Sequence, residues 1–322
     1  MSEPIHLKDK QPDVDPTRVG VSYSGGGALV LIELGIANAF VKLGIVPDVI
    51  TGVSAGALAG AAHALDPING KGIRVAADIL ANDVSNDLLG LTPFHVLGRL
   101  LVEREHIRSL GDNAAIAPLM TAALKREFNL DNVTIGHFAP PDRPKLLIIA
   151  TDVENRDSVV FPDDCSLVNA VVASSSIPGV FPWRTITIAG TERVLVDGGV
   201  VMNQPLSNLV EQRCGTIYAC AVGPTDPLPV PANALDNAIR AVNLSVHQAT
   251  KLEEAYVQLI FNNLRKGTVH HIHPIINYLS GDNFDFNADL VRTVMDDAEA
   301  QTIDWLTRPH PEDSTGATHN GT

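Results

Sequence analysis

The stretch "VPDVITGVSAGALAG", residues 46–60, changes character halfway along. Its first half is apolar and rich in β-branched residues, which is typical of a buried strand, and its second half consists of small residues that suit a helix. The change falls on the letters "GVSAG", and Gly-x-Ser-x-Gly at a sharp strand-to-helix turn presents a serine hydroxyl. The pattern predicts Ser54 as a nucleophile, Gly52 and Gly56 as the elbow glycines, and the N–H of Ala55 as an oxyanion donor. The alternative is that these small residues only let a helix lie close to a sheet.

A second turn of the same kind lies upstream. The segment "RVGVSYS", residues 18–24, alternates in the manner of a strand, and the apolar segment after it is typical of a helix that ends near Leu43. Strand, helix, strand and helix in this order predict a right-handed parallel crossover. Residues 18–65 therefore indicate an α/β fold.

Three glycines, Gly25, Gly26 and Gly27, join this first strand to its helix. They do not form a dinucleotide-binding motif, because Val30 occupies the third glycine position of Gly-x-Gly-x-x-Gly. Two interpretations stay open. The glycines form a tight turn, or their N–H groups point at developing negative charge as an oxyanion hole.

The rest of the chain continues the alternation of strands and helices. Further strands are expected at 145–151, 157–161, 193–199, 216–222 and 268–276, and helices over most of 73–138, over 235–264 and over 288–306. Polar segments flank this core, a leader over residues 1–16 and a tail over 309–322. We therefore expect a single domain, residues 17–308, between a flexible leader and a disordered tail.

Composition narrows the class of protein. The 322 residues are 45% hydrophobic and 19% charged, which is typical of a soluble globular protein. The net charge of −14 argues against nucleic acid as a partner, because phosphates require clustered Lys and Arg. No apolar stretch reaches the roughly 20 residues that a transmembrane helix needs, and no secretion signal is recognisable. Cys165, Cys214 and Cys220 lack metal-binding or disulfide spacing, which favours reduced thiols and a cytoplasmic location.

A serine hydroxyl needs a base to become a useful nucleophile. Asp197 in "LVDGGV" ends an apolar strand and precedes two glycines, and strand ends are where open α/β sheets bind ligands. The alternative base is a histidine late in the chain, as in a Ser-His-Asp triad. The candidates are His247, His270, His271, His273, His310 and His319. The "HHIH" segment has no carboxylate beside it at ligand spacing, which favours core or surface histidines.

Two other groups compete for the catalytic roles. Ser174, Ser175 and Ser176 lack the flanking glycines of an elbow, which favours lining or capping the site. Asp152 ends the apolar segment "KLLIIAT" but precedes no glycine pair, which favours a role in a turn.

Taken in order, these blocks resemble the patatin-like phospholipases. The glycine triplet comes first, then "GVSAG", then "DGG" at 197–199, and "VVASSSIPGVFP" at 171–182 is similar to the Ala-Ser-x-x-x-Pro segment of that family. "ATDVENRDSVVF", residues 150–161, resembles its central strand and the hairpin that follows. The resemblance covers residues 18–225, and four ordered blocks are far more specific than any one of them.

The resemblance implies a three-layer α/β/α sandwich with a mainly parallel central sheet, and hydrolysis of acyl esters by a Ser–Asp dyad without histidine. Ser54 would be the nucleophile and Asp197 the proton acceptor, with the oxyanion surrounded by Gly25, Gly26, Gly27 and the Ala55 N–H. The substrate would be a lipid or another acyl ester, with transient membrane contact and no metal or organic cofactor.

The sequence departs from the family at one place. Where the family follows its glycines with a small residue, Arg or Lys, and Gly, this chain has Ala28, Leu29 and Val30. The missing positive charge leaves open whether phospholipid is the substrate. Two alternatives to the dyad hydrolase remain: a histidine-triad α/β-hydrolase, and a patatin-like binding protein with weak catalytic activity.

Overall fold

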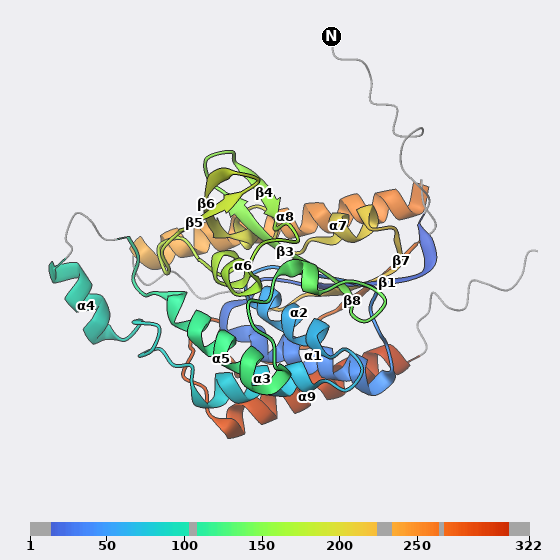
Figure 1. Ribbon diagram of the computed structural model, residues 1–322, viewed down its shortest axis with the longest axis horizontal. Helices are drawn as coiled ribbons and strands as arrows, with labels where there is room; N and C mark the ends of the chain where they lie inside the picture. The colour runs from blue at the N-terminus through green and yellow to red at the C-terminus, as the bar shows by residue number, and fades with distance from the viewer. Residues whose placement is uncertain (1–13, 103–107, 224–233, 264–266, 309–322) are drawn as a thin grey trace, which may run out of the picture.

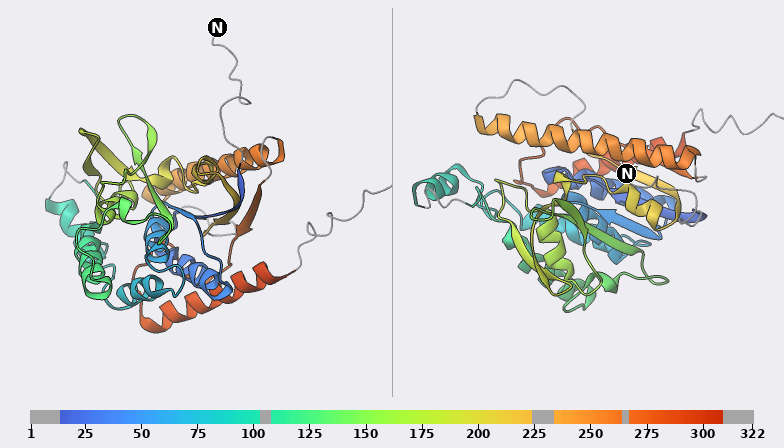
Figure 2. Two further views of the ribbon diagram at one scale, coloured as in Figure 1. Left: turned by 45° about the vertical axis from the view of Figure 1, so that its right-hand side comes forward. Right: turned by 90° about the horizontal axis from the view of Figure 1, so that it is seen from above.

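The computed structural model describes residues 14–102, 108–223, 234–263 and 267–308. In these ranges the chain forms an eight-stranded sheet in the order β5-β6-β3-β2-β1-β7-β8, and β4 pairs with β3 off this path. Helices cover both faces of the sheet (Figure 1; Figure 2, left). This confirms the three-layer α/β/α sandwich.

The centre of the sheet is parallel. Its strands are β1 (Asp15–Tyr23), β2 (Val49–Gly52), β3 (Lys145–Asp152), β7 (Cys214–Cys220) and β8 (Thr268–Ile272). β2 is buried along its whole length and β3 along all but its first residue. The middle of β3, residues 146–150, is a continuous apolar run because helices cover both faces of a parallel sheet.

One edge of the sheet is antiparallel. It consists of β4 (Asp157–Val160), β5 (Arg184–Ile188) and β6 (Thr191–Asp197). The prediction of a mainly parallel sheet is therefore confirmed for the centre, whereas the sequence did not predict β5. β5 is only partly buried along its length, so it lacks the apolar run that marks the central strands.

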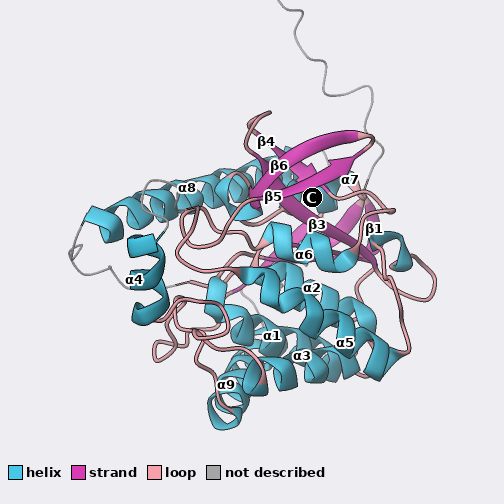
Figure 3. Ribbon diagram, turned by 60° about the vertical axis from the view of Figure 1, so that its left-hand side comes forward, coloured by secondary structure: helices cyan, strands magenta, loops and turns pink. Residues whose placement is uncertain are grey.

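The two helical layers are unequal. One face carries α1 (Val30–Leu43), α2 (Ala55–Leu65), α3 (Lys71–Asn82), α5 (Ile116–Phe128), α6 (Leu167–Ser174) and α9 (Ala288–Thr307). The other face carries α7 (Leu206–Glu211) and the long α8 (Ala234–Asn263), while α4 (Pro93–Val102) projects from the body (Figures 1 and 3). The short helices α6 and α7 were not predicted from the sequence. None of the described helices is long and apolar enough to cross a membrane.

Candidate active site

The turn between β2 and α2 is a strained elbow. Ser54 has φ 54° and ψ −119°, a conformation that costs energy in a residue with a side chain. A Cβ at position 52 would clash with the carbonyl oxygen of Gly56, and a Cβ at position 56 would clash with those of Tyr23 and Ser24. Only glycine fits at these two positions, which explains the Gly-x-Ser-x-Gly pattern in terms of backbone contacts.

Ser174 supports this elbow from behind. The N–H of Ser54 donates to Ser174 Oγ at 2.9 Å, and Ser174 Oγ donates to the carbonyl of Ile149 at 2.6 Å. Ser174 is fully buried at the end of α6, so its hydroxyl is committed to these two bonds. This agrees with the expectation that the three serines line or cap the site, but the bond to the Ser54 N–H was not predicted, because the sequence offered only a run of three serines.

The register of the sheet brings Asp197 level with Ser54. β3 lies between β2 and β6, with Gly52 aligned to Ile148 and Asp197 aligned to Ala150. Ser54 comes two residues after Gly52, and Ala150 comes two residues after Ile148. Because β6 runs antiparallel to β3, its last residue, Asp197, lies level with the elbow on the other side of β3.

Asp197 is a buried carboxylate with an unusual pKa. It is 6% exposed, and its Oδ1 accepts the N–H of Gly199 at 2.8 Å. Burial raises the pKa of Asp197 to about 6, although the hydroxyl of Ser54 and the N–H of Gly199 favour the charged form. Its buried Oδ2 accepts no well-formed hydrogen bond from a described residue. A carboxylate with a raised pKa and a free oxygen, close to a serine hydroxyl, has the properties of a general base.

The glycine loop lies against Ser54, and its amides differ in what they bind. Gly25 donates its N–H to the carbonyl of Asn203 at 3.1 Å, so this amide is not available to a substrate. The N–H groups of Gly26, Gly27 and Ala55 have no acceptor among the described residues. Of the four residues that the sequence placed around an oxyanion, three therefore have amides that are free to bind one.

Asn203 is a residue of the site that the sequence analysis missed. A Cβ on Gly25 would clash with Asn203 Oδ1 and would lie 3.3 Å from the Cβ of Ser54. A Cβ on Gly199 would lie 2.7 Å from Asn203 Oδ1 and 3.0 Å from Asp197 Oδ1. The Asn203 side chain thus fills the space between the glycine loop and the turn after Asp197. No sequence signal marked it beyond its place shortly after "DGG".

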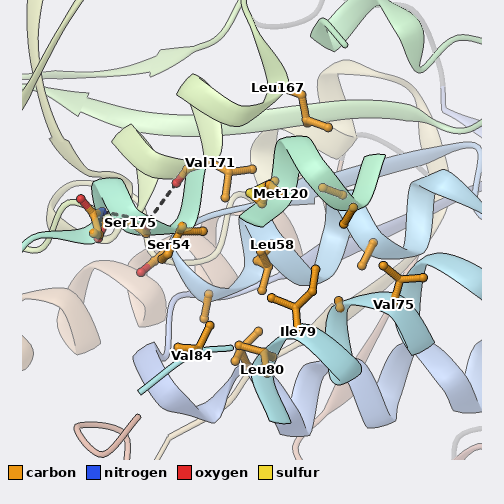
Figure 4. A pocket seen from close by; sticks show the side chains of 18 of the residues that line it. Ser54, Leu58, Val75, Ile79, Leu80, Val84, Met120, Leu167, Val171 and Ser175 are labelled. Atoms are coloured by element: carbon orange, nitrogen blue, oxygen red, sulfur yellow. Dashed lines mark hydrogen bonds between the residues drawn. The ribbon is translucent and has the colours of Figure 1, made fainter. Parts of the chain in front are cut away.

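Ser54 lies at one end of an apolar pocket of about 120 Å³ (Figure 4). Its walls come from α2, α3, α5 and α6, and Phe181 and Phe284 complete the lining. Leu58, Ile79 and Met120 are typical of the surface that a bound molecule would meet. The site can therefore place an apolar group next to a serine hydroxyl.

The candidate histidines lie elsewhere. His270 stacks on Tyr218 with ring centroids 5.1 Å apart, and His247 and His273 are exposed. His271 Nδ1 lies 3.7 Å from Glu254 Oε1, which corrects the expectation that the "HHIH" segment has no carboxylate beside it, because Glu254 comes from α8. His310 and His319 lie outside the described residues. No described histidine is hydrogen-bonded to Ser54 or Asp197.

The rival residues have other partners. Asp152 accepts the N–H groups of Glu154 and Asn155, both at 3.0 Å, and pairs with Arg193 at 3.1 Å, which confirms its role in a turn. Ser175 lines the pocket, and its hydroxyl donates to the carbonyl of Val171 at 2.9 Å. Within the described ranges, no three His, Cys, Asp or Glu side chains gather closely enough to hold a metal ion.

Comparison with known sequences identifies a family. Residues 21–210 match the patatin-like phospholipases. An uncharacterized NTE family protein of Mycobacterium bovis is 28% identical over 203 residues, which make up 62% of this chain and 29% of that protein. The lysophospholipase NTE1 of Kluyveromyces lactis is 24% identical over 217 residues, 65% of this chain and 13% of that enzyme. The chain spans less than a third of these relatives.

Comparison with solved structures gives distant likenesses. The crystal structure of VipD from Legionella pneumophila aligns at a TM-score of 0.47 and 14% identity, over 91% of this chain and 67% of VipD. Human GIVD cytosolic phospholipase A2 aligns at a TM-score of 0.47 and 13% identity, over 89% of this chain and 58% of that enzyme.

Proposed function

Because this chain belongs to the patatin-like phospholipase family, we propose that it is a serine hydrolase of lipid acyl esters that works through a Ser54–Asp197 dyad. The observation that carries the proposal is the buried Asp197 carboxylate, with its raised pKa, beside the strained Ser54 elbow at the end of an apolar pocket. Both relatives are much longer than this chain, so their names do not assign a substrate to it. The choice of lipid acyl esters as substrates therefore rests on the apolar pocket beside Ser54.

In the first half of the reaction, Asp197 takes the proton of the Ser54 hydroxyl as its oxygen attacks the ester carbonyl. The carbonyl oxygen becomes an oxyanion, which the amides of Gly26, Gly27 and Ala55 stabilise. As the tetrahedral intermediate collapses, Asp197 returns the proton to the departing alcohol, and the acyl group stays on Ser54. In the second half, Asp197 deprotonates a water that attacks the acyl-enzyme, and the acid is released with Ser54 reprotonated.

The start of α2 adds to the stabilisation of negative charge. Ala55 is the first residue of this helix, and the dipole of a helix favours an anion at its N-terminus. This backbone contribution is independent of any cationic side chain. It is therefore retained although Arg or Lys is missing after the glycine triplet.

The residue in place of that cation has a different role. Leu29 is 7% exposed and belongs to the core, and a Cβ on Gly281 would lie 3.6 Å from Leu29 Cγ. Gly281 in turn accepts the N–H of Ala28 at 2.9 Å. Leu29 therefore packs the glycine loop against the segment around Gly281, and an arginine there would have to bury its charge.

Labelling with a fluorophosphonate tests the proposal. We expect a single adduct on Ser54, lost together with esterase activity in Ser54→Ala and retained in Ser175→Ala, a matched control in the same pocket. Asp197→Asn should lower the rate by at least about 10³-fold, whereas single alanine variants of His247, His270, His271 and His273 should keep most activity. Loss of activity in one histidine variant that still folds, with Asp197→Asn active, would establish a histidine triad instead.

A further inference from the structure

The pocket is long, and it follows α2 from end to end. On α2 its lining residues recur every three or four positions: Ala55, Leu58, Ala61, Ala62 and Leu65. Residues with this spacing share one face of a helix, so the pocket runs alongside α2 rather than across it. α3 and α5 contribute rows with the same spacing, and α6 adds Leu167 and Val171, which makes the pocket a channel between four helices.

The three rows define a near end and a far end. At the near end lie Ser54, Val84 and Ser175, and toward the far end lie Val75 and Leu167 (Figure 4). α3 runs back along α2, since a Cβ on its Gly72 would clash with the carbonyl of Ala62 near the end of α2. The channel therefore begins at the nucleophile and extends away from the strand ends.

An aromatic ring lies at the far end. Phe128, the last residue of α5, lines the pocket, and Lys71 Nζ lies 4.9 Å above the centre of its ring. Lys71 also pairs with Glu127 Oε2 at 3.6 Å and donates to the carbonyl of Glu127. These contacts hold Phe128 between the apolar channel and the charged surface.

The distance from Ser54 to this end limits the length of a bound chain. The helical rise over the 11 residues of α2 is roughly 16 Å. An extended hydrocarbon with C–C bonds of about 1.5 Å and tetrahedral angles advances about 1.25 Å per carbon. The channel is thus as long as an acyl chain of about 12 to 13 carbons, counted from the ester carbonyl.

Building on the proposed function, we propose that this channel measures the acyl chain, so that the preferred substrates carry linear chains of about 12 carbons. Each CH₂ that enters the channel adds about fourfold to kcat/KM, which corresponds to about 0.8 kcal/mol per buried CH₂. The ring of Phe128 closes the far end of the channel, so further carbons bury no additional apolar surface in it and the gain ends there.

The length of the channel depends on small residues in its far half. Ala123 on α5 lines the pocket between Met120 and Phe128, and it is 5% exposed. A leucine at this position would extend into the channel and close the far part. Its neighbour Ala122 is exposed on the outer side of the same helix and does not line the pocket, so Ala122→Leu is a matched control.

The experiment measures kcat/KM for p-nitrophenyl esters of 2 to 16 carbons, and labelling rates for alkyl fluorophosphonates of the same lengths. For the wild type and Ala122→Leu we expect a rise to an optimum at about 12 carbons. For Ala123→Leu the optimum should fall by about four to six carbons, as expected from the about 7 Å of α5 between residues 123 and 128.

Phe128→Ala tests the far end from the opposite direction, because it removes the ring and should move the optimum to longer chains. The same optimum in the wild type, Ala123→Leu and Phe128→Ala, with normal thermal unfolding of each, would overturn the proposal about chain length and leave the hydrolase intact. Absence of turnover on every ester, short chains included, would instead reject the proposed function.

Discussion

Ser174 fixes the position of Ser54 through the backbone: its Oγ accepts the Ser54 N–H at 2.9 Å and donates to the carbonyl of Ile149 at 2.6 Å. The central strand and the elbow are joined by this hydroxyl. A serine that the sequence presents as a rival nucleophile thus acts as a support for the nucleophile. Its hydroxyl hydrogen is occupied in the bond to Ile149.

We expect Ser174→Ala to lower both stability and rate. Two buried groups, the Ser54 N–H and the Ile149 carbonyl, lose their partner, at a cost of about 1–3 kcal/mol each when a group stays unsatisfied. kcat should fall while KM changes little, because the elbow loses its alignment and the acyl channel is intact. Fluorophosphonate should still label Ser54, only more slowly. Complete loss of labelling with a normal fold would mean that Ser174 itself reacts.

The raised pKa of Asp197 predicts an acidic limb in the pH profile. Asp197 must be deprotonated to accept the Ser54 proton, and burial raises the pKa of this carboxyl to about 6. kcat/KM should therefore rise tenfold per pH unit below about pH 6 and become flat above it. The profile of His271→Ala should superpose on that of the wild type. A limb that shifts or disappears in this histidine variant would assign the titration to an imidazole.

The same pKa predicts that the dyad lowers stability at neutral pH. The pKa of Asp197 rises from 3.8 in the unfolded chain to about 6 in the folded protein. Its contribution is therefore most favourable below pH 3.8 and is lost as the pH rises through about 6, by about 3 kcal/mol in total. Asp197→Asn removes the charge and keeps an oxygen for the Gly199 N–H.

We thus expect the inactive Asp197→Asn to unfold at a higher denaturant concentration than the wild type at pH 8, with the difference vanishing toward pH 4. Urea titrations at both pH values measure it. An Asn variant less stable than the wild type at pH 8 would show that the carboxylate is held by stronger interactions than its hydrogen bond to Gly199.

The glycine loop offers a test with an internal rescue. A Cβ on Gly26 would clash with Val222 Cγ2, so Gly26→Ala should displace the loop and its amides. We expect a fall in kcat of about 10²-fold, as for loss of an oxyanion donor. Val222→Ala alone should be nearly silent, and the double variant should regain most of the rate because the clash is removed. Normal turnover in Gly26→Ala would assign the loop a purely structural role.

The elbow and Asp197 were predictable because local chemistry marks them. Gly52 and Gly56 are required by backbone contacts within a few residues of Ser54 or with the adjacent strand, and Asp197 stands at a strand end before two glycines. Constraints of this kind leave a pattern in consecutive residues. The central strands were predictable for a related reason, since burial on both faces leaves uninterrupted apolar runs.

Contacts across the fold were not predictable in this way. Ser174 is 120 residues from Ser54 in sequence, and nothing in its neighbours shows that its hydroxyl reaches the elbow. Asn203 acts through packing between two turns, and Phe284 lines the pocket from beyond the family segment 21–210. Such residues become visible only when the register of the sheet and the path of the chain are known.

Phe284 leads to a last prediction, on the segment that carries it. Asn86 holds this segment with four hydrogen bonds: its N–H and Nδ2 donate to Asp285, its Nδ2 also donates to Asn283, and its Oδ1 accepts the Phe284 N–H, at 2.9–3.1 Å. Phe284 packs edge-on against Phe181, with ring centroids 6.5 Å apart, at the wall of the pocket.

Asn86→Ala should therefore release the segment without altering the dyad. The hydrogen bonds made by both Asn86 side-chain atoms are lost. Since each such bond stabilises the fold by a net free energy of about 1 kcal/mol, the Phe284 amide should exchange its hydrogen at least about tenfold faster. KM for esters of long chains should rise severalfold, because Phe284 no longer holds its place in the wall, while the two-carbon ester is hydrolysed as before. Asn283→Ala removes one of the four bonds, together with the bond that Asn283 Oδ1 accepts from the Asp285 N–H, and serves as the graded control. Unchanged exchange at Phe284 in Asn86→Ala would show that the aromatic packing alone fixes this wall, and the hydrogen bonds would then have no part in shaping the pocket.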